Sequence, residues 1–439
     1  MDTKQHWSVE NAAQRLDASL NRLSEGSTAT DHIFSGVFSE RVKQDLVALY
    51  DQTETPLSGA LVSVKALLDV EGEVTHAGTR FLADGAPASE DAPAVANLRK
   101  AGALCLGHTN MSELAYSGLG VNPHYGTADN PLAPGHVPGG STSGGAVSVA
   151  TGLADIAVGS DTGGSLRIPA AFCGITGFKP TQSTVSRQGA VPLSDSLDSL
   201  GPMANNVAAC AQAWQIMAGL SDEALFQQVS NAPLAFQVSR NFGFDGLDAD
   251  VEAGFEMLVT ALSGAGMAIT DEPLAFLDSY AKIAPWQLTS VECRAHFETA
   301  FQNQSELFDP RVHSRMARAD ELSAVQYRQM LNLRTQFAEA MSDGLAGRVL
   351  LLPTVAILPP TLASLEDDGT FTQMNLMALR NTSLANIGDG CSLAIPYQHN
   401  GVTLSAMLVA AGGADVSLLA AGRELERQIA QLGLSLNAS

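Results

Sequence analysis

Lysine is scarce in this chain of 439 residues. Lysine and arginine together supply 24 basic side chains against 46 acidic ones, so the formal net charge is -22. Sequence-independent binding to nucleic acids, and docking on an anionic membrane surface, both need clusters of basic residues. The composition therefore argues against nucleic acid or membrane as a partner. The lysines are Lys4, Lys43, Lys65, Lys100, Lys179 and Lys282.

The five cysteines are widely spread and form no CxxC pair. We therefore expect neither a zinc site nor a disulfide framework, which fits a reducing compartment and a cytoplasmic protein. The first ten residues are polar and lack the apolar core of a signal peptide. The chain contains no run of about 18 apolar residues, so we expect no transmembrane helix.

Several motifs of known enzyme classes are also missing. The nine histidines form no HxH or HExxH pair, and neither GxxxxGK[ST] nor GxGxxG occurs, so we expect no metal, nucleotide or other cofactor. The GxSxG elbow of α/β-hydrolases is absent, because residues 140–144 read GSTSG. An S-x-x-K at residues 279–282 has no KTG companion, and we interpret it as chance. A histidine-based triad on another fold stays open.

The residues that are present predict a folded α/β protein. Hydrophobic residues make up 45% of the chain and charged residues 16%, which excludes disorder for most of it. The length allows roughly two to three domains or one large α/β domain. Apolar periodicity predicts helices over 8–23, 40–50, 92–101, 204–220, 249–265 and 417–431, and buried strands over 60–70, 103–107, 349–352, 393–396 and 402–409.

Residues 138–181 are dense in glycine, serine and threonine. Such a composition is typical of flexible linkers, but apolar runs at 146–150 and 156–158 interrupt it, and a linker would not contain them. Glycines beside apolar elements instead indicate backbone that approaches another group closely.

Lys65 lies within the predicted buried strand 60–70. Burial favours the neutral amine and lowers the pKa of a lysine, and a neutral lysine can act as a general base. A snorkelling lysine at a strand end, or a structural ion pair, explains the pattern equally well. Spacing alone leaves these interpretations open.

The stretch from Gly139 to Thr181 resembles the amidase signature family. It matches without a gap a pattern of GGSS-like start, alanine-rich helix, GSDTGGS-[IL]-R-x-P and CGxxGxKPT. Weaker similarity includes Lys65, residues 107–113 (GHTNMSE), residues 125–127 and residues 384–396. Relatives often have an acidic residue directly after the lysine, where this chain has Ala66.

The resemblance implies a Ser–cis-Ser–Lys triad. It assigns Ser165 as the nucleophile, Ser141 as the bridging serine after a cis peptide bond, and Lys65 as the base. It implies an oxyanion hole from the backbone N–H groups of Thr162, Gly163, Gly164 and Ser165. Other motif residues are assigned to substrate binding or support: Thr142, Ser143, Asp161, Arg167, Tyr116 and Tyr125. We expect Asp161 and Arg167 to pair and hold the loop rather than to bind substrate.

These expectations combine into one hypothesis. The fold is an α/β/α domain with a large mixed β-sheet surrounded by helices, formed by N-terminal helices (1–58), a core (59–220), a mostly helical cover (225–345) and a return to the core (346–439). The function is hydrolysis of a linear carboxylic amide through an acyl-serine, with a small-molecule amide as partner and a homodimer left open. The alternatives are a ureide hydrolase acting on a carboxybiuret-like compound, the A-type subunit of a glutamine-dependent tRNA amidotransferase, and a catalytically silent binding or assembly protein.

Overall fold

The chain begins with a helix whose first turn is fixed by its own sequence. The structure is a computed structural model that describes all residues except 1–6, 27–29, 52, 221–234 and 437–439. Helix α1 (Val9–Glu25) starts after Ser8, whose hydroxyl accepts a hydrogen bond from Asn11 N, while the Asn11 side chain accepts one from Ser8 N. This reciprocal capping satisfies two amides that a helix start otherwise leaves unpaired.

A single mixed sheet of 11 strands runs through the molecule in the order β1-β3-β2-β4-β6-β5-β10-β11-β9-β7-β8. Strand β2 pairs in parallel with β3 and β4, whereas β6, β5, β10, β11 and β9 follow in antiparallel pairs. The strands are β1 (Phe34–Val37), β2 (Leu61–Lys65), β3 (Leu104–Thr109), β4 (Ile156–Asp161), β5 (Thr176–Lys179), β6 (Ser199–Ala204), β7 (Phe236–Val238), β8 (Ile269–Asp271), β9 (Val349–Pro353), β10 (Cys391–His399) and β11 (Val402–Ala410).

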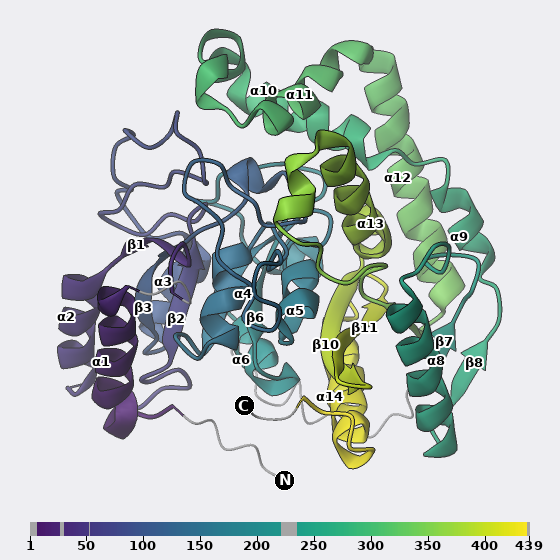
Figure 1. Ribbon diagram of the computed structural model, residues 1–439, viewed down its shortest axis with the longest axis horizontal. Coiled ribbons are helices and arrows are strands. Elements are labelled where there is room, and N and C mark those ends of the chain that lie inside the picture. Colours follow the sequence, from purple (N-terminus) through teal and green to yellow (C-terminus); the bar gives the residue numbers. More distant parts are fainter. Residues whose placement is uncertain (1–6, 27–29, 52, 221–234, 437–439) are drawn as a thin grey trace.

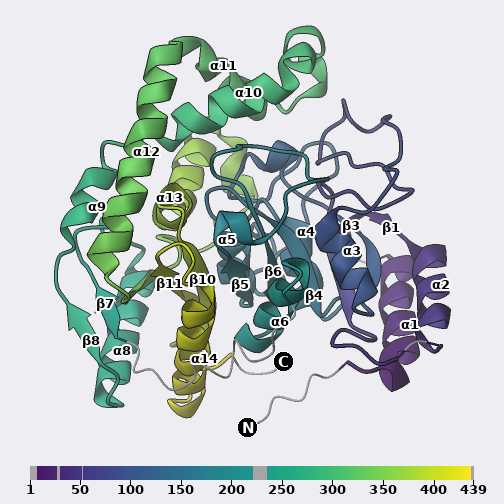
Figure 2. The same cartoon turned by 180° about the vertical axis from the view of Figure 1, so that it is seen from behind.

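Helices cover both faces of this sheet (Figure 1). Helices α4 and α5 pack on one face, against β4 and β5, and helices α3, α6 and α14 pack on the other. After α1 the helices are α2 (Ser39–Leu49), α3 (Pro93–Lys100), α4 (Ser143–Ala150), α5 (Arg167–Cys173), α6 (Val207–Met217), α8 (Ala249–Gly264), α9 (Ala275–Tyr280), α10 (Pro285–Asn303), α11 (Pro310–Ala317), α12 (Ala324–Leu345), α13 (Asp368–Ile387) and α14 (Asp415–Gln431). Both views show α10 and α11 lying across one end of the sheet (Figure 2).

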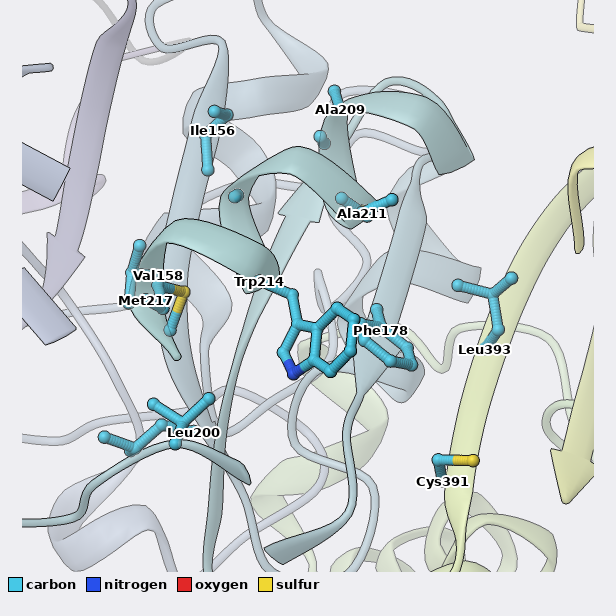
Figure 3. Close-up of a cluster of buried hydrophobic side chains, with 14 of the residues drawn as sticks. Ile156, Val158, Phe178, Leu200, Ala209, Ala211, Trp214, Met217, Cys391 and Leu393 are labelled. Carbon is cyan, nitrogen blue, oxygen red and sulfur yellow. The ribbon is translucent and has the colours of Figure 1, made fainter. Parts of the chain in front are cut away.

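The hydrophobic core beneath α6 is centred on aromatic contacts (Figure 3). Trp214 of α6 meets Phe178 of β5 edge to face, with ring centroids 5.7 Å apart. Val158 on β4 and Leu393 on β10 belong to the same cluster. Strands from the middle and from the end of the chain therefore share one core.

The structure confirms the α/β class with a large mixed sheet, and most of the expected elements. The strand expected over 60–70 is too long, because β2 ends at Lys65 and the chain then turns, although Leu67, Leu68 and Val70 stay buried. A buried apolar run does not by itself show where a strand ends and a loop begins. The expected helical cover also contains β7 and β8, and its residues 225–234 lie outside the described residues. The division of the chain into these parts stays a prediction.

None of the helices in the described part of the chain is long and apolar enough to cross a membrane.

Candidate active site

Lys65 is the last residue of β2, and its side chain is fully buried. The strand lies between β3 and β4 in a parallel arrangement that buries both of its faces. The Nζ atom donates hydrogen bonds to Ser141 Oγ at 2.7 Å and to Ser160 Oγ at 2.9 Å, and the carbonyl oxygen of Ser160 lies 3.5 Å away. The lysine amine is thus surrounded by hydroxyl and carbonyl oxygens, without a carboxylate in direct contact among the described residues.

Burial is the main cause of a lowered pKa at Lys65. Desolvation penalises the ammonium form, and the negative charges of Asp161 and Asp198 offset only part of this penalty. The resulting pKa is about 7, compared with an ordinary value of 10.5. A substantial fraction of the amine is therefore neutral at physiological pH.

Ser141 lies in the loop that precedes α4 and follows a cis peptide bond between Gly140 and Ser141, as predicted. The loop is held by backbone hydrogen bonds on both sides of this bond. Gly140 N donates to Gly118 O at 2.8 Å, and Ser112 N donates to Ser141 O at 3.1 Å. These contacts fix the direction of the buried Ser141 side chain toward Lys65.

Ser165 follows β4 after a short loop and is 2% exposed. Its carbonyl oxygen accepts a hydrogen bond from Thr142 N at 3.3 Å, so the loop of Ser165 and the loop of Ser141 are joined through their backbones. Gly164 has φ +138°, and a Cβ atom there would lie 2.1 Å from Thr382 Oγ1. Only glycine fits at this position, which explains one glycine of the motif.

Not all four backbone amides predicted for the oxyanion hole are free to bind an oxyanion. Gly164 N donates to Asp161 Oδ1 at 2.8 Å, so this amide is occupied by the protein itself. The hydroxyl of Thr162 donates to Asp198 Oδ1 at 2.5 Å, which anchors the start of the loop. The amides of Thr162, Gly163 and Ser165 are left as the candidates for binding an oxyanion.

Asp161 and Arg167 form a fully buried ion pair, with 2.9 Å between Asp161 Oδ1 and Arg167 Nη2. All three guanidinium nitrogens donate to protein oxygens, including Thr382 O and Asn386 Oδ1. Burial raises the pKa of Asp161, but the charge and hydrogen bonds of Arg167 outweigh it and lower the pKa to about 2. The pair therefore supports the Ser165 loop, as expected from the sequence.

Thr142 and Ser143 are buried beside the site and make support contacts. Thr142 Oγ1 donates to Ser160 O at 3.5 Å, and Ser143 Oγ donates to Asn110 O at 3.4 Å. Where the structure describes the site, neither side chain forms a hydrogen bond with Lys65 or Ser165.

Tyr116 and Tyr125, which were assigned to substrate binding or support, have hydroxyls that donate hydrogen bonds to the protein itself. Tyr116 OH donates to Thr289 Oγ1 at 3.1 Å, and burial raises its pKa. Tyr125 OH donates to Thr79 O at 3.0 Å, and its ring stacks on His76. The structure does not bring either tyrosine into contact with the lysine and the two serines.

Two groups beside Lys65 were not identified from the sequence. Ser160 lies inside the GSDTGGS motif, so its proximity to the site could have been inferred, but its direct contact with Lys65 could not. Asp198 lies 33 residues after Ser165 in the sequence, and nothing local indicates its role. Both line a cavity of about 320 Å³, together with Leu67, Arg187, Asp195 and Leu200 among others.

No group of three or more His, Cys, Asp or Glu side chains in the described residues is arranged to hold a metal ion.

A hydrolase of C–N bonds is the class that the fold and its relatives define. The chain belongs to the amidase family, because the family model described as Amidase matches residues 16–419. Members of this family act on small amide substrates. The protein is therefore an enzyme of this class.

Individual relatives agree with this assignment. The chain is 33% identical over 391 residues to the 2-amino-5-chloromuconic acid deaminase of Comamonas testosteroni, covering 86% of this chain and 83% of the relative. It is 31% identical over 400 residues to Amidase 1 of Oryza sativa subsp. japonica, covering 85% and 91%. A solved amidase structure matches with a TM-score of 0.84 at 29% identity, over 96% of this chain and 98% of the other.

Proposed function

We propose that the protein hydrolyses a linear amide through an acyl-serine intermediate, with Ser165 as nucleophile, Ser141 as proton bridge and Lys65 as base. The observation that carries this proposal is the 2.7 Å hydrogen bond between Lys65 Nζ and Ser141 Oγ in a fully buried setting. A lysine with a pKa of about 7 can accept a proton at neutral pH, which an ordinary lysine cannot do.

The contacts of Lys65 give the amine a defined orientation. A neutral amine has two N–H bonds and one lone pair. If the N–H bonds point to the hydroxyl and the carbonyl of Ser160, the lone pair faces Ser141. In the neutral, reactive form the direction of this hydrogen bond is therefore reversed: the Ser141 hydroxyl donates to Lys65, and its own oxygen can accept the proton of Ser165.

The reaction then proceeds in two stages. Ser165 Oγ bonds to the amide carbonyl carbon while its proton passes to Ser141 and the Ser141 proton passes to Lys65. The C–N bond breaks, and the relay returns a proton to the departing ammonia or amine. Water attacks the acyl ester by the same relay and releases the carboxylic acid and Ser165.

The negative charge that develops on the carbonyl oxygen is stabilised best by hydrogen-bond donors that are already in position before the reaction. We assign this role to the amides of Thr162, Gly163 and Ser165. Asp198 and the Asp161–Arg167 pair hold the two ends of their loop.

The test is the Ser165→Ala variant. It should lose hydrolysis of a panel of aliphatic, aryl and ureide amides that includes glutamine, and it should lose covalent labelling by a fluorophosphonate, measured by intact mass. The matched control is Ser143→Ala, which removes a buried hydroxyl beside the site whose contact is Asn110 O and should keep both properties. Turnover or labelling in Ser165→Ala would exclude Ser165 as the nucleophile, and the best substrate in the panel would identify the acyl and amine groups.

A further inference from the structure

A second cavity lies at the hairpin of β10 and β11, and we name it the hairpin cavity. Its volume is about 280 Å³, and its walls come from five separate segments of the chain. They include Leu132, Phe172 at the end of α5, Val251 of α8, Ile357 after β9, and Tyr397 and Leu404 of the hairpin. No aspartate, glutamate, lysine or arginine belongs to this lining.

Tyr397 is one of four polar residues in the lining, with His136, Thr403 and Ser405, and it is the most buried of them. Its side chain is 1% exposed and lines the cavity, and no described residue hydrogen-bonds to its hydroxyl. The hydroxyl is not among the fully enclosed polar atoms that lack a partner, so an acceptor that enters the cavity can reach it. Burial also raises the pKa of Tyr397, so the hydroxyl keeps its proton and remains a donor.

The walls of the hairpin cavity are held in place without a ligand. Val137 N donates to Pro360 O at 3.0 Å and Leu362 N donates to Gly135 O at 2.9 Å, which ties the loop of Leu132 to the loop after β9. Asp248 N donates to Ala356 O at 2.9 Å and fixes the start of α8. A preformed cavity binds a small molecule at a lower entropic cost than one that must be ordered.

The cavity is separate from the candidate active site. Lys65, Ser141 and Ser165 do not line it. Ser392 on β10 contacts Arg167, whereas Tyr397 lies five residues further along the same strand, which corresponds to roughly 17 Å.

We propose that the hairpin cavity binds a small uncharged molecule that has one aromatic-sized apolar body and one hydrogen-bond acceptor for Tyr397. An apolar cavity of about 150 Å³ is large enough for benzene, so the hairpin cavity has room for one ring with a short substituent. The absence of aspartate, glutamate, lysine and arginine from the lining selects against ions. This site goes beyond amide hydrolysis and does not depend on the proposed triad.

The test uses two probes that contain no amide and cannot be hydrolysed: acetophenone, which has a carbonyl acceptor, and ethylbenzene, which has none. Binding is measured by titration calorimetry on the full chain. Both should bind the natural protein. Tyr397→Phe should weaken acetophenone by roughly fivefold, the effect of one hydrogen bond, and leave ethylbenzene unchanged.

Two further variants fix the location. Val251→Phe fills the cavity and should weaken both probes at least tenfold. Tyr50→Phe removes the hydroxyl of an exposed tyrosine that does not line the cavity, and it should change the affinity of neither probe. A crystal soaked in 4-bromoacetophenone locates the ligand through the bromine signal, and this holds even if Val251→Phe fails to fold. Absence of binding, bromine density elsewhere, or equal acetophenone affinity in Tyr397→Phe would overturn the proposal.

Discussion

Asp198 accepts a hydrogen bond from the hydroxyl of Thr162 at 2.5 Å, and its charge also acts on Lys65. One carboxylate is therefore coupled both to the loop that carries Ser165 and to the proposed base. Its two other contacts, from the amides of Leu193 and Ser194, fold the segment 193–198 around it.

The rate of amide hydrolysis should depend on the protonation of Lys65. The reactive form is the neutral amine, so kcat/KM should rise with pH through about 7 and level off above it. One unit below that pKa the rate should be roughly a tenth of the plateau. The measurement is a pH profile between 5.5 and 9 on the best amide substrate, and a flat profile would contradict the role of Lys65 as base.

Replacing Asp198 by asparagine should move this profile. The charge of Asp198 raises the pKa of Lys65, so its removal lowers that pKa and shifts the acidic limb to lower pH. The pH at the midpoint of the acidic limb does not depend on how much of the enzyme is folded. Asp195→Asn is the matched control: Asp195 lines the same cavity but is not among the charges that act on Lys65. An equal shift in both variants would show that the net charge around the cavity, and not Asp198 in particular, determines the pH of the acidic limb.

Breaking the buried pair of Asp161 and Arg167 should destabilise the fold. Asp161→Asn leaves the Arg167 charge without its partner, and such a loss typically costs about 3–5 kcal/mol of unfolding free energy. Glu256→Gln, at an exposed pair with Arg240, should change stability little. Denaturant unfolding of both variants measures the difference.

The same pair predicts an acid limit. The pKa of Asp161 is lowered from 3.8 to about 2 in the folded state, so the stability that its ionisation contributes is complete above 3.8 and is lost as the pH falls through about 2. The difference in unfolding free energy between the natural protein and Asp161→Asn should therefore shrink as the pH falls from about 4 to about 2. A difference that stays constant over this range would contradict the assignment.

Glu292 links the helical cover to residues 193–198, the segment that folds around Asp198, through hydrogen bonds. This buried carboxylate of α10 accepts hydrogen bonds from Ser196 Oγ at 2.5 Å, Ser196 N at 3.1 Å and Tyr327 OH at 2.8 Å, and also from the hydroxyl of Ser194. Glu292→Gln replaces an acceptor of four hydrogen bonds by a mixed donor and acceptor, so we expect a lower kcat with a smaller change in KM. Stability should fall by roughly 1–3 kcal/mol.

The control for Glu292 is Glu298→Gln on the exposed side of the same helix, where the carboxylate contacts Arg294 and Gln302. This change should leave both kinetic constants unaltered. If Glu292→Gln lowers stability but its folded fraction keeps the natural kcat, the contact is structural and does not position the loop.

The sequence was most informative where the relevant contacts are local. The serine cap of α1, the buried strand that contains Lys65 and the ungapped motif around Ser141 and Ser165 all follow from neighbouring residues. Partners from distant segments could not be inferred. Asn386 lies on α13, 225 residues after Asp161, and donates to its carboxylate at 2.9 Å.

A short element was missed for a related reason. Strand β8 has three residues, too few for an alternating pattern, and its paired neighbour in the sheet is β7. The hairpin of β10 and β11 had a usable signal: Asn400 and Gly401 have φ of 49° and 79°, as a two-residue turn of this dipeptide requires.

The order of strands in the sheet has a consequence for synthesis of the protein. Strand β5 ends at Lys179, but its neighbour β10 begins only at Cys391, 212 residues later. At the usual pace of a ribosome, about 5–20 residues per second, the nascent chain waits roughly 10–40 s before this neighbour emerges. During that interval the hydrogen-bonding edge of β5 has no native strand to cover it, and such open edges promote association between chains. The yield of active enzyme should therefore depend on how densely ribosomes are loaded on its message and on how quickly a chaperone reaches the half-made sheet.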